Sequence, residues 1–540
     1  MDVTAYATAQ VALPEYYNFT TDVVERWARV RPDAMALWWM SEDGASQRFT
    51  FADMARMARK SAAFLHDCGI RKGDRVIVIM QRVPQWWFAM LGLIRLGAVP
   101  VPGTPLLTGS DITQRVGFSE AVAIITDLDN VSRMPELSCM KILAGASLPG
   151  WIDFDHGVGQ ARQDMPAEPT LSSDAGIVYF TSGTSGEAKM VLHTQVSYGL
   201  AHAITGGSWL DLRPDDLIWA LADTGWGKTS WSGMYGPWLM GACVFVLDMR
   251  GKFDPNVVLR HLADIPITVF CAPATALRLL VRKDLHLYSF KHLRHCVSAG
   301  ETLNVPVYES WLNGTHLHIY EGYGQTELVC CVANVRSRNE PIRPGSMGKA
   351  TPGHDVRIVD NLGQPLPPGK EGNIAISVHP HRPVGMFQEY WKNPKETADR
   401  FVNGFYMTGD TGRYDAEGYF WFCGRSDDVI NSSSYRIGPS EVEDAVISHP
   451  SVLECAAIGV PDELRGEVVK VFVVLRSEFS PSDHLRKEIQ AHCKKVTAPY
   501  KYPRQVEFIA ALPKTVSGKT RRVALRCLEL KRRSDAAGVR

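Results

Sequence analysis

Residues 181–189 combine the residue types that can hold phosphate groups. The segment carries hydroxyls and glycines and closes with a lysine: Thr181, Ser182, Gly183, Thr184, Ser185, Gly186, Glu187, Ala188 and Lys189. Glycines let backbone amides approach an anion, while hydroxyls and an ammonium add charge-assisted hydrogen bonds of about 1.5–3 kcal/mol each. The pattern therefore predicts a phosphate-binding loop for a nucleoside triphosphate. A flexible linker without chemistry is the alternative that this segment alone leaves open.

The segment differs from the usual triphosphate loop, G-x-x-x-x-G-K-[S/T], in which the lysine follows a glycine directly. Lys189 instead follows Ala188 and precedes Met190. Residues 222–229 come closer to the pattern but lack its first glycine. The sequence therefore disfavours an ordinary P-loop nucleotide hydrolase.

A second cluster of polar and aromatic residues follows a predicted strand at 317–320. Open α/β sheets place ligands at the carboxyl ends of their strands, and here the chain carries Tyr320, Glu321, Gly322, Tyr323, Gly324, Gln325, Thr326 and Glu327. Tyr323 is suited to stack on a base and Thr326 to bond a phosphate oxygen. Glu327 is suited to help hold Mg²⁺, which prefers oxygen ligands. A polar turn capped by glutamate is the alternative.

Two further clusters lie nearer the C-terminus. Asp410 follows Thr408 and Gly409, and Arg425 comes after a hairpin-like segment at 415–418. As a pair, Asp410 could accept both ribose hydroxyls while the guanidinium of Arg425 meets a phosphate in fork geometry. Lys519 lies at the tip of a predicted tight turn. Taken singly, the acid is typical of a turn and the lysine of a solvated surface.

These residues need a framework, and the pattern from 51 to 125 predicts an α/β fold. Helix-like stretches at 51–68 and 84–96 alternate with strand-like stretches at 76–80, 99–101 and 121–126. Such alternation is typical of a doubly wound, largely parallel sheet. Further strands are predicted at 243–247, 268–271, 295–298 and 317–320.

The pattern of predicted helices, strands and turns changes twice towards the C-terminus. Around 341–424 short strands alternate with turn signals, which predicts a smaller β-rich, barrel-like subdomain. After Asp427 the order becomes helix (439–449), strands (456–460 and 468–475), helix (483–495) and strand (505–509). We therefore expect a large N-terminal domain of mixed sheets over 1–426 and a small α+β C-terminal domain over 427–540.

Composition excludes several classes of protein. The 540 residues include 58 basic and 58 acidic side chains, so no net charge favours nucleic acid or an anionic membrane. The 11 cysteines form no C-x-x-C pair, which predicts reduced thiols in an intracellular protein. The N-terminus resembles neither a signal peptide nor a transit peptide, and the apolar segment 86–102 is interrupted by Arg95. We expect a cytoplasmic protein without integral membrane association, and assembly into a homo-oligomer stays open.

Together and in this order, the four clusters resemble the adenylate-forming superfamily of acyl-CoA synthetases, luciferases and peptide-synthetase adenylation domains. The resemblance covers nearly the whole chain and rests on T-S-G-T-S-G-x-x-K, Y-G-Q-T-E, T-G-D, G-R-x-D-D-V and a late P-K-T-x-S-G-K. The segments 223–228, 430–433, 435–443, 465–470 and 497–503 are similar to the medium-chain acyl-CoA synthetase branch.

The resemblance implies ATP, Mg²⁺ and coenzyme A as cofactors and two half-reactions at one site. A carboxylate first attacks the α-phosphate of ATP to give an acyl-adenylate and pyrophosphate, and the thiol of coenzyme A then displaces AMP. It implies a medium-chain fatty or branched acid as substrate. An aryl, benzoate-like acid is the alternative substrate. Delivery to a carrier protein and a nucleotide-binding scaffold without catalysis are the alternative functions.

The resemblance also assigns roles to residues of this chain. Lys519 and Thr326 would act on the reacting groups and Glu327 on the metal, while residues 181–189 and 321–325, with Gly300, Glu301, Asp410 and Arg425, would hold the nucleotide. Asp427 would be the hinge about which the small domain rotates. The passage for coenzyme A would involve Ser433, Ser434, Tyr435, Arg465 and Lys494, and Trp226 would wall the acyl pocket. Ser434 stands where the family usually has glycine, which predicts slower thioester formation.

Overall fold

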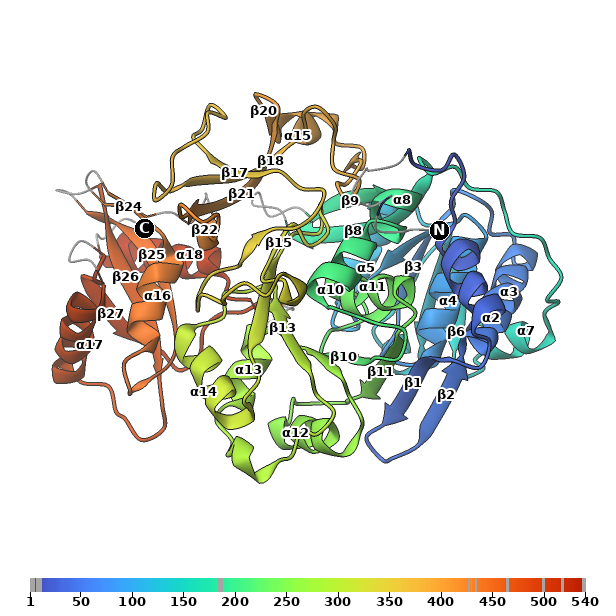
Figure 1. Ribbon diagram of the computed structural model, residues 1–540, viewed down its shortest axis with the longest axis horizontal. Helices are drawn as coiled ribbons and strands as arrows, with labels where there is room; N and C mark the ends of the chain where they lie inside the picture. Colours follow the sequence, from blue (N-terminus) through green and yellow to red (C-terminus); the bar gives the residue numbers. More distant parts are fainter. Residues whose placement is uncertain are drawn as a thin grey trace.

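The computed structural model describes residues 5, 12–182, 188–425, 428, 430–432, 435–462, 466–497, 501–515 and 519–536. The chain forms a large part, which extends to residue 425, and a small part from residue 428 onwards. Figure 1 shows the small part (red) at one end of the molecule and the N-terminal sheet (blue) at the other. No helix within the described ranges is long and apolar enough to cross a membrane.

The large part begins with a parallel five-stranded sheet in the order β4-β3-β5-β6-β7. Its strands are β3 (Arg75–Ile79), β4 (Val99–Pro102), β5 (Ala123–Asp127), β6 (Met140–Ala144) and β7 (Ile152–Asp153). The helices of this region are α2 (Glu25–Val30), α3 (Phe51–Asp67), α4 (Pro84–Arg95), α5 (Gly109–Ser119), α6 (Leu128–Val131) and α7 (Phe154–Gln160). These bounds confirm the predicted βαβ alternation.

Helix α3 shows how local chemistry sets these boundaries. The hydroxyl of Thr50 accepts a hydrogen bond from the backbone N–H of Asp53 at 3.1 Å, and the Asp53 carboxylate accepts one from the N–H of Thr50 at 3.0 Å. This reciprocal cap satisfies two donors that the first helical turn leaves without partners. The buried face of the helix, which includes Met54, Ala58 and Leu65, then packs on the core.

A second sheet of nine strands carries the order β16-β15-β14-β13-β12-β10-β11-β1-β2. The strands from β1 to β14 in this order pair in parallel and the outer strands pair antiparallel, which confirms a mixed, doubly wound architecture. The bounds are β1 (Met35–Ser41), β2 (Ser46–Thr50), β10 (Leu217–Ala220), β11 (Cys243–Asp248), β12 (Val269–Cys271), β13 (His295–Ala299), β14 (Ile319–Tyr323), β15 (Val332–Ala333) and β16 (Lys349–Ala350).

Short helices connect and cover these strands. They are α8 (Gln195–Gly199), α9 (His202–Ile204), α10 (Gly227–Ser230), α11 (Gly236–Leu239), α12 (Pro255–Asp264), α13 (Ala274–Leu280) and α14 (Val305–Thr315). The fully buried side chains of Trp209, Trp238 and Trp311 are among the largest in this core. Because each buries a large apolar surface, these tryptophans fix how helices and sheet pack.

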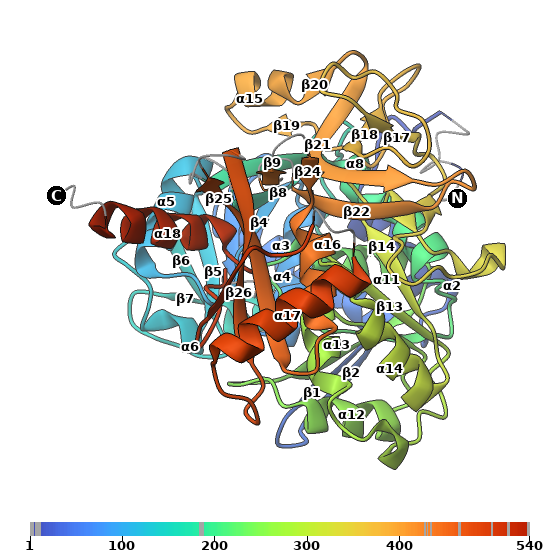
Figure 2. The same ribbon diagram turned by 90° about the vertical axis from the view of Figure 1, so that its left-hand side faces the viewer.

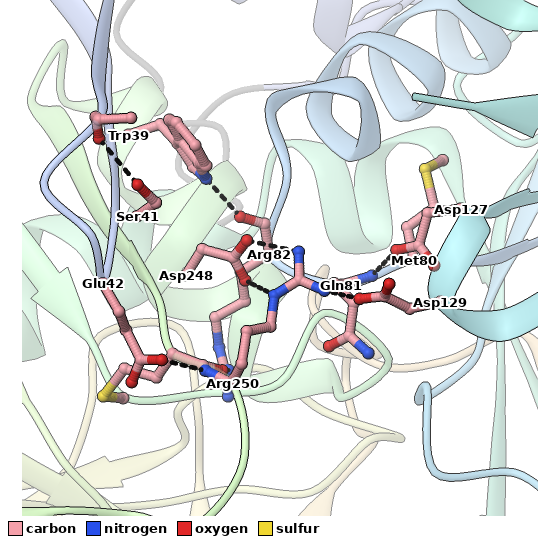
Figure 3. A network of polar contacts seen from close by, with 12 residues as sticks. Trp39, Ser41, Glu42, Met80, Gln81, Arg82, Asp127, Asp129, Asp248 and Arg250 are labelled. Carbon is pink, nitrogen blue, oxygen red and sulfur yellow. Dashed lines mark hydrogen bonds and ion pairs between the residues drawn. The ribbon is translucent and has the colours of Figure 1, made fainter. Parts of the chain in front are cut away.

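A polar network joins the two sheets where their strands end (Figure 3). Arg250, just after β11, makes an ion pair of 2.6 Å with Asp248, and its backbone N–H donates to Glu42 at 3.1 Å. Its guanidinium also pairs with Asp129, which follows β5. The indole N–H of Trp39 donates to the carbonyl of Arg82 at 2.7 Å. A cleft of about 520 Å³ opens here, and none of the predicted site residues lines it.

The remaining sheets of the large part are antiparallel. One contains β19, β9 and β8, and the other contains β17, β18, β21 and β20 with β22 paired to β21. Their bounds are β8 (Ala175–Ser182), β9 (Ala188–Thr194), β17 (Val356–Val359), β18 (Gly372–Ser377), β19 (Glu389–Tyr390), β20 (Phe401–Val402), β21 (Phe405–Tyr414) and β22 (Phe420–Arg425), with the helix α15 (Pro394–Asp399). The second of these sheets is the β-rich region that the turn signals predicted.

The small part is an α+β unit built on a five-stranded sheet, in the order β24-β23-β26-β25 with β27 paired to β26. Its elements are β23 (Ile430–Ser432), β24 (Tyr435–Ile437), α16 (Pro439–Ile447), β25 (Val452–Asp462), β26 (Gly466–Leu475), α17 (Asp483–Val496), β27 (Gln505–Phe508) and α18 (Arg522–Ala536). In Figure 2 these elements face the viewer in front of the large part. The predicted order of helices and strands in this region is confirmed.

Candidate active site

Asp410 and Arg425 lie on neighbouring antiparallel strands. β21 and β22 pair so that Asp410 is directly opposite Arg425. The guanidinium Nε lies 3.5 Å from the Asp410 carboxylate. Side-chain exposure separates the two residues, at 6% for the acid and 43% for the arginine. The acid is therefore buried in the sheet, while the arginine side chain reaches the surface.

The second sequence cluster supplies the other partners of Asp410. The hydroxyl of Tyr323, at the end of β14, donates to the Asp410 carboxylate at 2.6 Å. The amide of Gln325 donates to the same oxygen at 2.6 Å. Burial raises the pKa of the Asp410 carboxyl, while Arg425 and these donors act in the opposite direction. The structure thus brings together residues that lie more than 80 positions apart, as the sequence clusters predicted.

Two glycines of the second cluster have a packing role. A Cβ at Gly322 would lie 2.6 Å from the ring of Trp209, and one at Gly324 would lie 2.5 Å from the ring of Trp231. At Gly324 the carbonyl oxygen of Val329 would also lie 2.5 Å away, so no side chain fits at either position unless these neighbours move. These glycines therefore let β14 and the following turn approach the aromatic core, a reason that the sequence did not reveal.

Thr326 and Glu327 are both held by histidine or tyrosine partners. The carbonyl of Thr326 lies 2.7 Å from Nε2 of His193, and burial lowers the pKa of His193 to about 3. This histidine is therefore neutral, with Nε2 as the donor. The carboxylate of Glu327 accepts a hydrogen bond from the hydroxyl of Tyr390 at 2.8 Å. Thr326 and Glu327 therefore keep fixed backbone and carboxylate positions beside the second cluster.

The predicted phosphate loop is the connection of a β-hairpin. β8 and β9 pair antiparallel, with Thr181 opposite Lys189 and Ser182 opposite Ala188. This differs from a P-loop, in which the loop opens a helix. Residues 183–187, which carry Gly183, Thr184, Ser185, Gly186 and Glu187, lie outside the described residues.

Lys189 has a partner that the sequence did not predict. Its ammonium forms an ion pair with Glu396 on α15, and it lies 5.3 Å from the ring centroid of Tyr390. Arg400 contacts the same carboxylate at 3.0 Å. The Lys189 side chain is only 12% exposed, so Glu396 holds it in place at the base of the hairpin. No sequence pattern links residues 189 and 396.

Gly300 and Glu301 follow the end of β13. Gly300 has a φ of +94°, a left-handed conformation that favours glycine. The Glu301 carboxylate accepts a hydrogen bond from the guanidinium of Arg278 at 2.8 Å. The loop is therefore tied to α13 by an ion pair.

Lys228 is a site residue to which the sequence assigned no role, although it belongs to a failed P-loop pattern and to the segment 223–228 that resembles the acyl-CoA synthetase branch. Its ammonium donates to the carbonyl of Ala299 at 3.1 Å, directly before Gly300. Burial lowers its pKa, and the positive charge of Lys519 lowers it further. A cation therefore lies beneath the 300–301 loop. Trp226 stands at the N-terminal boundary of the same helix, α10, and is partly exposed, whereas Trp219 and Trp231 belong to the core.

Lys519 belongs to the small part, and its charge acts on residues of the large part. The backbone of Thr515 and that of Lys519 form a turn, closed by a hydrogen bond of 2.7 Å from the N–H of Thr515 to the carbonyl of Lys519. The charge of Lys519 affects the pKa of both Lys228 and Asp410. The charge of Lys519 therefore reaches the side of the large part where Asp410 and Lys228 lie.

The residues expected to meet coenzyme A are described only in part. Ser433, Ser434 and Arg465, like the expected hinge Asp427, lie outside the described residues. The backbone of Tyr435 opens β24. Lys494 is exposed on α17, with its ammonium 4.3 Å from the ring centroid of Tyr502.

The side chains of the site suit a metal ion that is held mainly by the phosphates of a substrate. Within the described ranges no group of three or more histidine, cysteine or acidic side chains could form a metal centre. Mg²⁺ is commonly bound by one or two carboxylates together with substrate phosphates and water. A single carboxylate, Glu327, near the phosphate hairpin suits that mode.

Comparison with known proteins defines the class first. The family model for AMP-binding enzymes matches residues 24–391, and that for their C-terminal domain matches residues 441–519. The chain therefore belongs to the AMP-binding enzyme family, as its motifs predicted.

Its relatives narrow the assignment to acyl-CoA synthetases. The chain is 47% identical to acyl-coenzyme A synthetase ACSM3, mitochondrial, of Homo sapiens over 97% of this chain and 91% of that protein. It is 44% identical to acyl-coenzyme A synthetase ACSM5, mitochondrial, of Homo sapiens, with 97% and 93% covered. The crystal structure of the anthranilate CoA ligase AuaEII with anthranoyl-AMP matches with a TM-score of 0.86 and 29% identity over 96% of this chain and 98% of that one. The predicted medium-chain acyl-CoA synthetase branch is confirmed.

Proposed function

We propose that this chain converts a carboxylic acid into its coenzyme A thioester with ATP, through an acyl-adenylate, and releases pyrophosphate and AMP. The activity follows from family membership. The observation that connects it to this chain is the charge of Lys519, which belongs to the small part and acts to lower the pKa values of both Asp410 and Lys228 in the large part.

The charges of the two substrates assign a role to each charged residue of the site. The acid and the triphosphate are both anions, so cations must hold them in line. Lys519 would neutralise the carboxylate and the α-phosphate, and the hairpin ending at Lys189 would hold the departing pyrophosphate. Asp410 would accept the ribose hydroxyls, with Arg425 at the rim. Glu301 and Tyr323 would lie beside the adenine.

Lys189 would have to share its contacts when ATP binds. Its ammonium now pairs with Glu396, and a triphosphate would compete with that carboxylate for it. Arg400, on the same carboxylate, keeps Glu396 neutralised if Lys189 turns away. We therefore propose that Glu396 holds Lys189 ready for the phosphates.

Isotope exchange provides the first test. Purified enzyme, ATP, Mg²⁺ and labelled pyrophosphate should give labelled ATP only when a suitable carboxylic acid is present. Adding coenzyme A should then yield acyl-CoA and AMP in equal amounts. If no acid from a broad panel supports exchange, the proposed function is wrong.

We propose a medium-chain fatty or branched acid as the substrate. Trp226, which is partly exposed beside Gly225 and Gly227, would provide an apolar wall. A Cβ at Gly227 would lie 3.1 Å from the hydroxyl of Tyr198 and 3.9 Å from that of Thr326, so glycine keeps this space open. An aryl acid is the second candidate, because one similar structure holds anthranoyl-AMP. Exchange rates with octanoate, 2-methylbutyrate, benzoate and anthranilate would decide between them.

We also propose that the two parts are domains that rotate about Asp427 between the half-reactions. After rotation, Ser433, Ser434 and Tyr435 would line the passage for coenzyme A, with Arg465 and Lys494 near its anionic end. The partners are then small molecules, namely ATP, coenzyme A and the acid. Replacing Ser434 with glycine should speed thioester formation from supplied acyl-adenylate if its side chain narrows the passage.

The compartment and the assembly need separate measurements. All 11 cysteines are free thiols, which agrees with a reducing compartment. We propose the cytoplasm, whereas the names of the relatives say mitochondrial. Imaging a fluorescent fusion of the full-length protein would distinguish the two locations, and light scattering would show whether the protein forms a homo-oligomer.

A further inference from the structure

Asn304 makes a side-chain contact between the large and the small part. It occupies the N-cap position of α14, where asparagine usually accepts a hydrogen bond from the start of its own helix. Its side chain makes no such cap. Instead its amide donates to the carboxylate of Asp444 on α16 of the small part. Asn304 is 5% exposed and Asp444 is exposed, so the contact is partly buried at the edge between the two parts.

The other end of the Asn304 amide points back to the nucleotide side. Its carbonyl oxygen accepts a hydrogen bond from the guanidinium of Arg278 at 3.2 Å, and the same guanidinium donates to Glu301 at 2.8 Å. Glu301 lies in the loop proposed to hold adenine. A continuous chain of polar contacts therefore runs from that loop through Arg278 and Asn304 to Asp444.

Asp444 and Lys519 are attached to the same strand of the small part. Helix α16, which carries Asp444, packs against β25. Lys514, at the start of the Lys519 turn, makes an ion pair of 2.8 Å with Glu454 on β25, and its backbone bridges to Thr520. A contact that fixes Asp444 against the large part therefore also fixes where the Lys519 turn lies.

We propose that Asn304 and Asp444 are positioning residues that hold the small part in the orientation for acyl-adenylate formation. Through Arg278 and Glu301, this contact responds to nucleotide in the adenine loop. The inference rests on the proposed function and goes beyond it, because it names the side chains that set one of the two orientations. Neither residue touches the reacting groups.

Several charged residues surround the contact between Asn304 and Asp444. Arg278 approaches Asp444 from α13, while Glu441 and Glu443 flank it on α16 and Glu321 faces it from β14. Glu441 is paired with Lys501 and Glu443 with Arg522. Burial raises the pKa of Asp444 to about 7 and that of Glu321 to about 8. Asp444 therefore changes its charge near neutral pH while it contacts Asn304.

The test separates the two half-reactions in the full-length enzyme. Asn304→Ala should lower acid-dependent ATP–pyrophosphate exchange about tenfold, the equivalent of about 1.4 kcal/mol for one lost hydrogen bond to a carboxyl group. Thioester formation from supplied acyl-adenylate and coenzyme A should stay within about twofold of the unmodified enzyme. Asn313→Ala, at an exposed position on the same helix, is the matched control and should change neither rate.

An exchange of the two side chains provides a second, sharper test. Asn304→Asp places a carboxylate against Asp444 and should lower exchange more than Asn304→Ala does. Adding Asp444→Asn restores a donor and an acceptor in reversed direction, and should recover exchange to within about threefold. Thermal unfolding of each variant shows whether it is folded.

Three results would overturn the inference. They are equal losses in both half-reactions, unchanged exchange in Asn304→Ala, and failure of the folded double variant to recover. If the unmodified enzyme shows no exchange with any acid, the proposed function itself fails. The two failures are therefore distinguishable.

Discussion

The surroundings of Asp410 and of Lys519 differ in how firmly they are built. Asp410 is buried on a strand and held by Tyr323 and Gln325 at 2.6 Å each. Lys519 is exposed on a turn of the small part. The first environment exists before any ligand arrives, whereas the second depends on how the small part is placed.

This difference assigns ATP binding to the surroundings of Asp410 and the order of the two half-reactions to Lys519. A group that must meet every ATP molecule gains from being preorganised, because no reorganisation is then needed on binding. A group that must leave after the first half-reaction gains from an exposed position on a movable part. Predictions about the two regions should therefore differ in kind, since loss of Lys519 should affect rate and loss of Asp410 should affect nucleotide affinity.

Lys519→Ala should have the largest effect. We expect acyl-adenylate formation to fall roughly 10²–10³-fold or more, by analogy with removing one charge-stabilising donor from a transition state. Thioester formation from supplied acyl-adenylate should continue. Lys487→Ala removes an exposed lysine from α17 of the same small part and serves as the control. Comparable losses in both half-reactions would contradict the distinction between the two regions.

Asp410→Asn should weaken nucleotide binding about 10- to 100-fold, because a hydrogen bond to a charged group contributes about 1.5–3 kcal/mol. The new amide would also face the donors of Tyr323 and Gln325. The measurement is the dissociation constant of ATP by calorimetry, and Asp399→Asn at an exposed position on α15 is the control. A lower rate at saturating ATP, without a change in the dissociation constant, would show that Asp410 acts in catalysis and not in nucleotide binding.

Glu327→Gln should raise the Mg²⁺ concentration needed for half-maximal exchange, roughly ten- to hundredfold if its carboxylate helps to hold the metal. Tyr390→Phe keeps the carboxylate of Glu327 and removes the hydroxyl that donates to it, so it should shift the requirement less. Exchange rates across a magnesium titration check both variants. An unchanged requirement in Glu327→Gln would remove this residue from the metal site.

The smallest expected effect is a pH dependence of the contact between the two parts. Free carboxyls have pKa values of about 4, but burial at the contact between the two parts raises the pKa of Asp444 to about 7. The packed orientation therefore binds this proton more strongly than the separated one, and it loses stability as pH rises from about 4 to 7.

Asp444→Asn keeps a hydrogen-bond acceptor for Asn304 and removes this titration. Relative to the unmodified enzyme, its exchange rate should rise by a fewfold between pH 6 and pH 8. Asp483→Asn, an exposed position on α17, should give a constant ratio. A ratio for Asp444→Asn that falls with pH would contradict the raised pKa.

Much of the site was predictable because each of its clusters is a short segment of neighbouring residues. The Tyr320–Glu327 cluster and the Asp410 strand are short segments with distinctive residue types, and the structure brings them into contact. Lys228 was harder to recognise, because its segment fits a P-loop only in part. Its role appears only when its contact with the carbonyl of Ala299 is visible.

The sequence by itself determined the types and order of the elements, the motif residues and the family, because each depends on local spacing. Only the tertiary structure decided that Glu396 holds Lys189, that two glycines make room for Trp209 and Trp231, and that Asn304 contacts Asp444. These partners lie far apart in the chain and carry no shared pattern. Their pairing follows from the packing of whole sheets and helices, which sets distances that spacing along the chain does not encode.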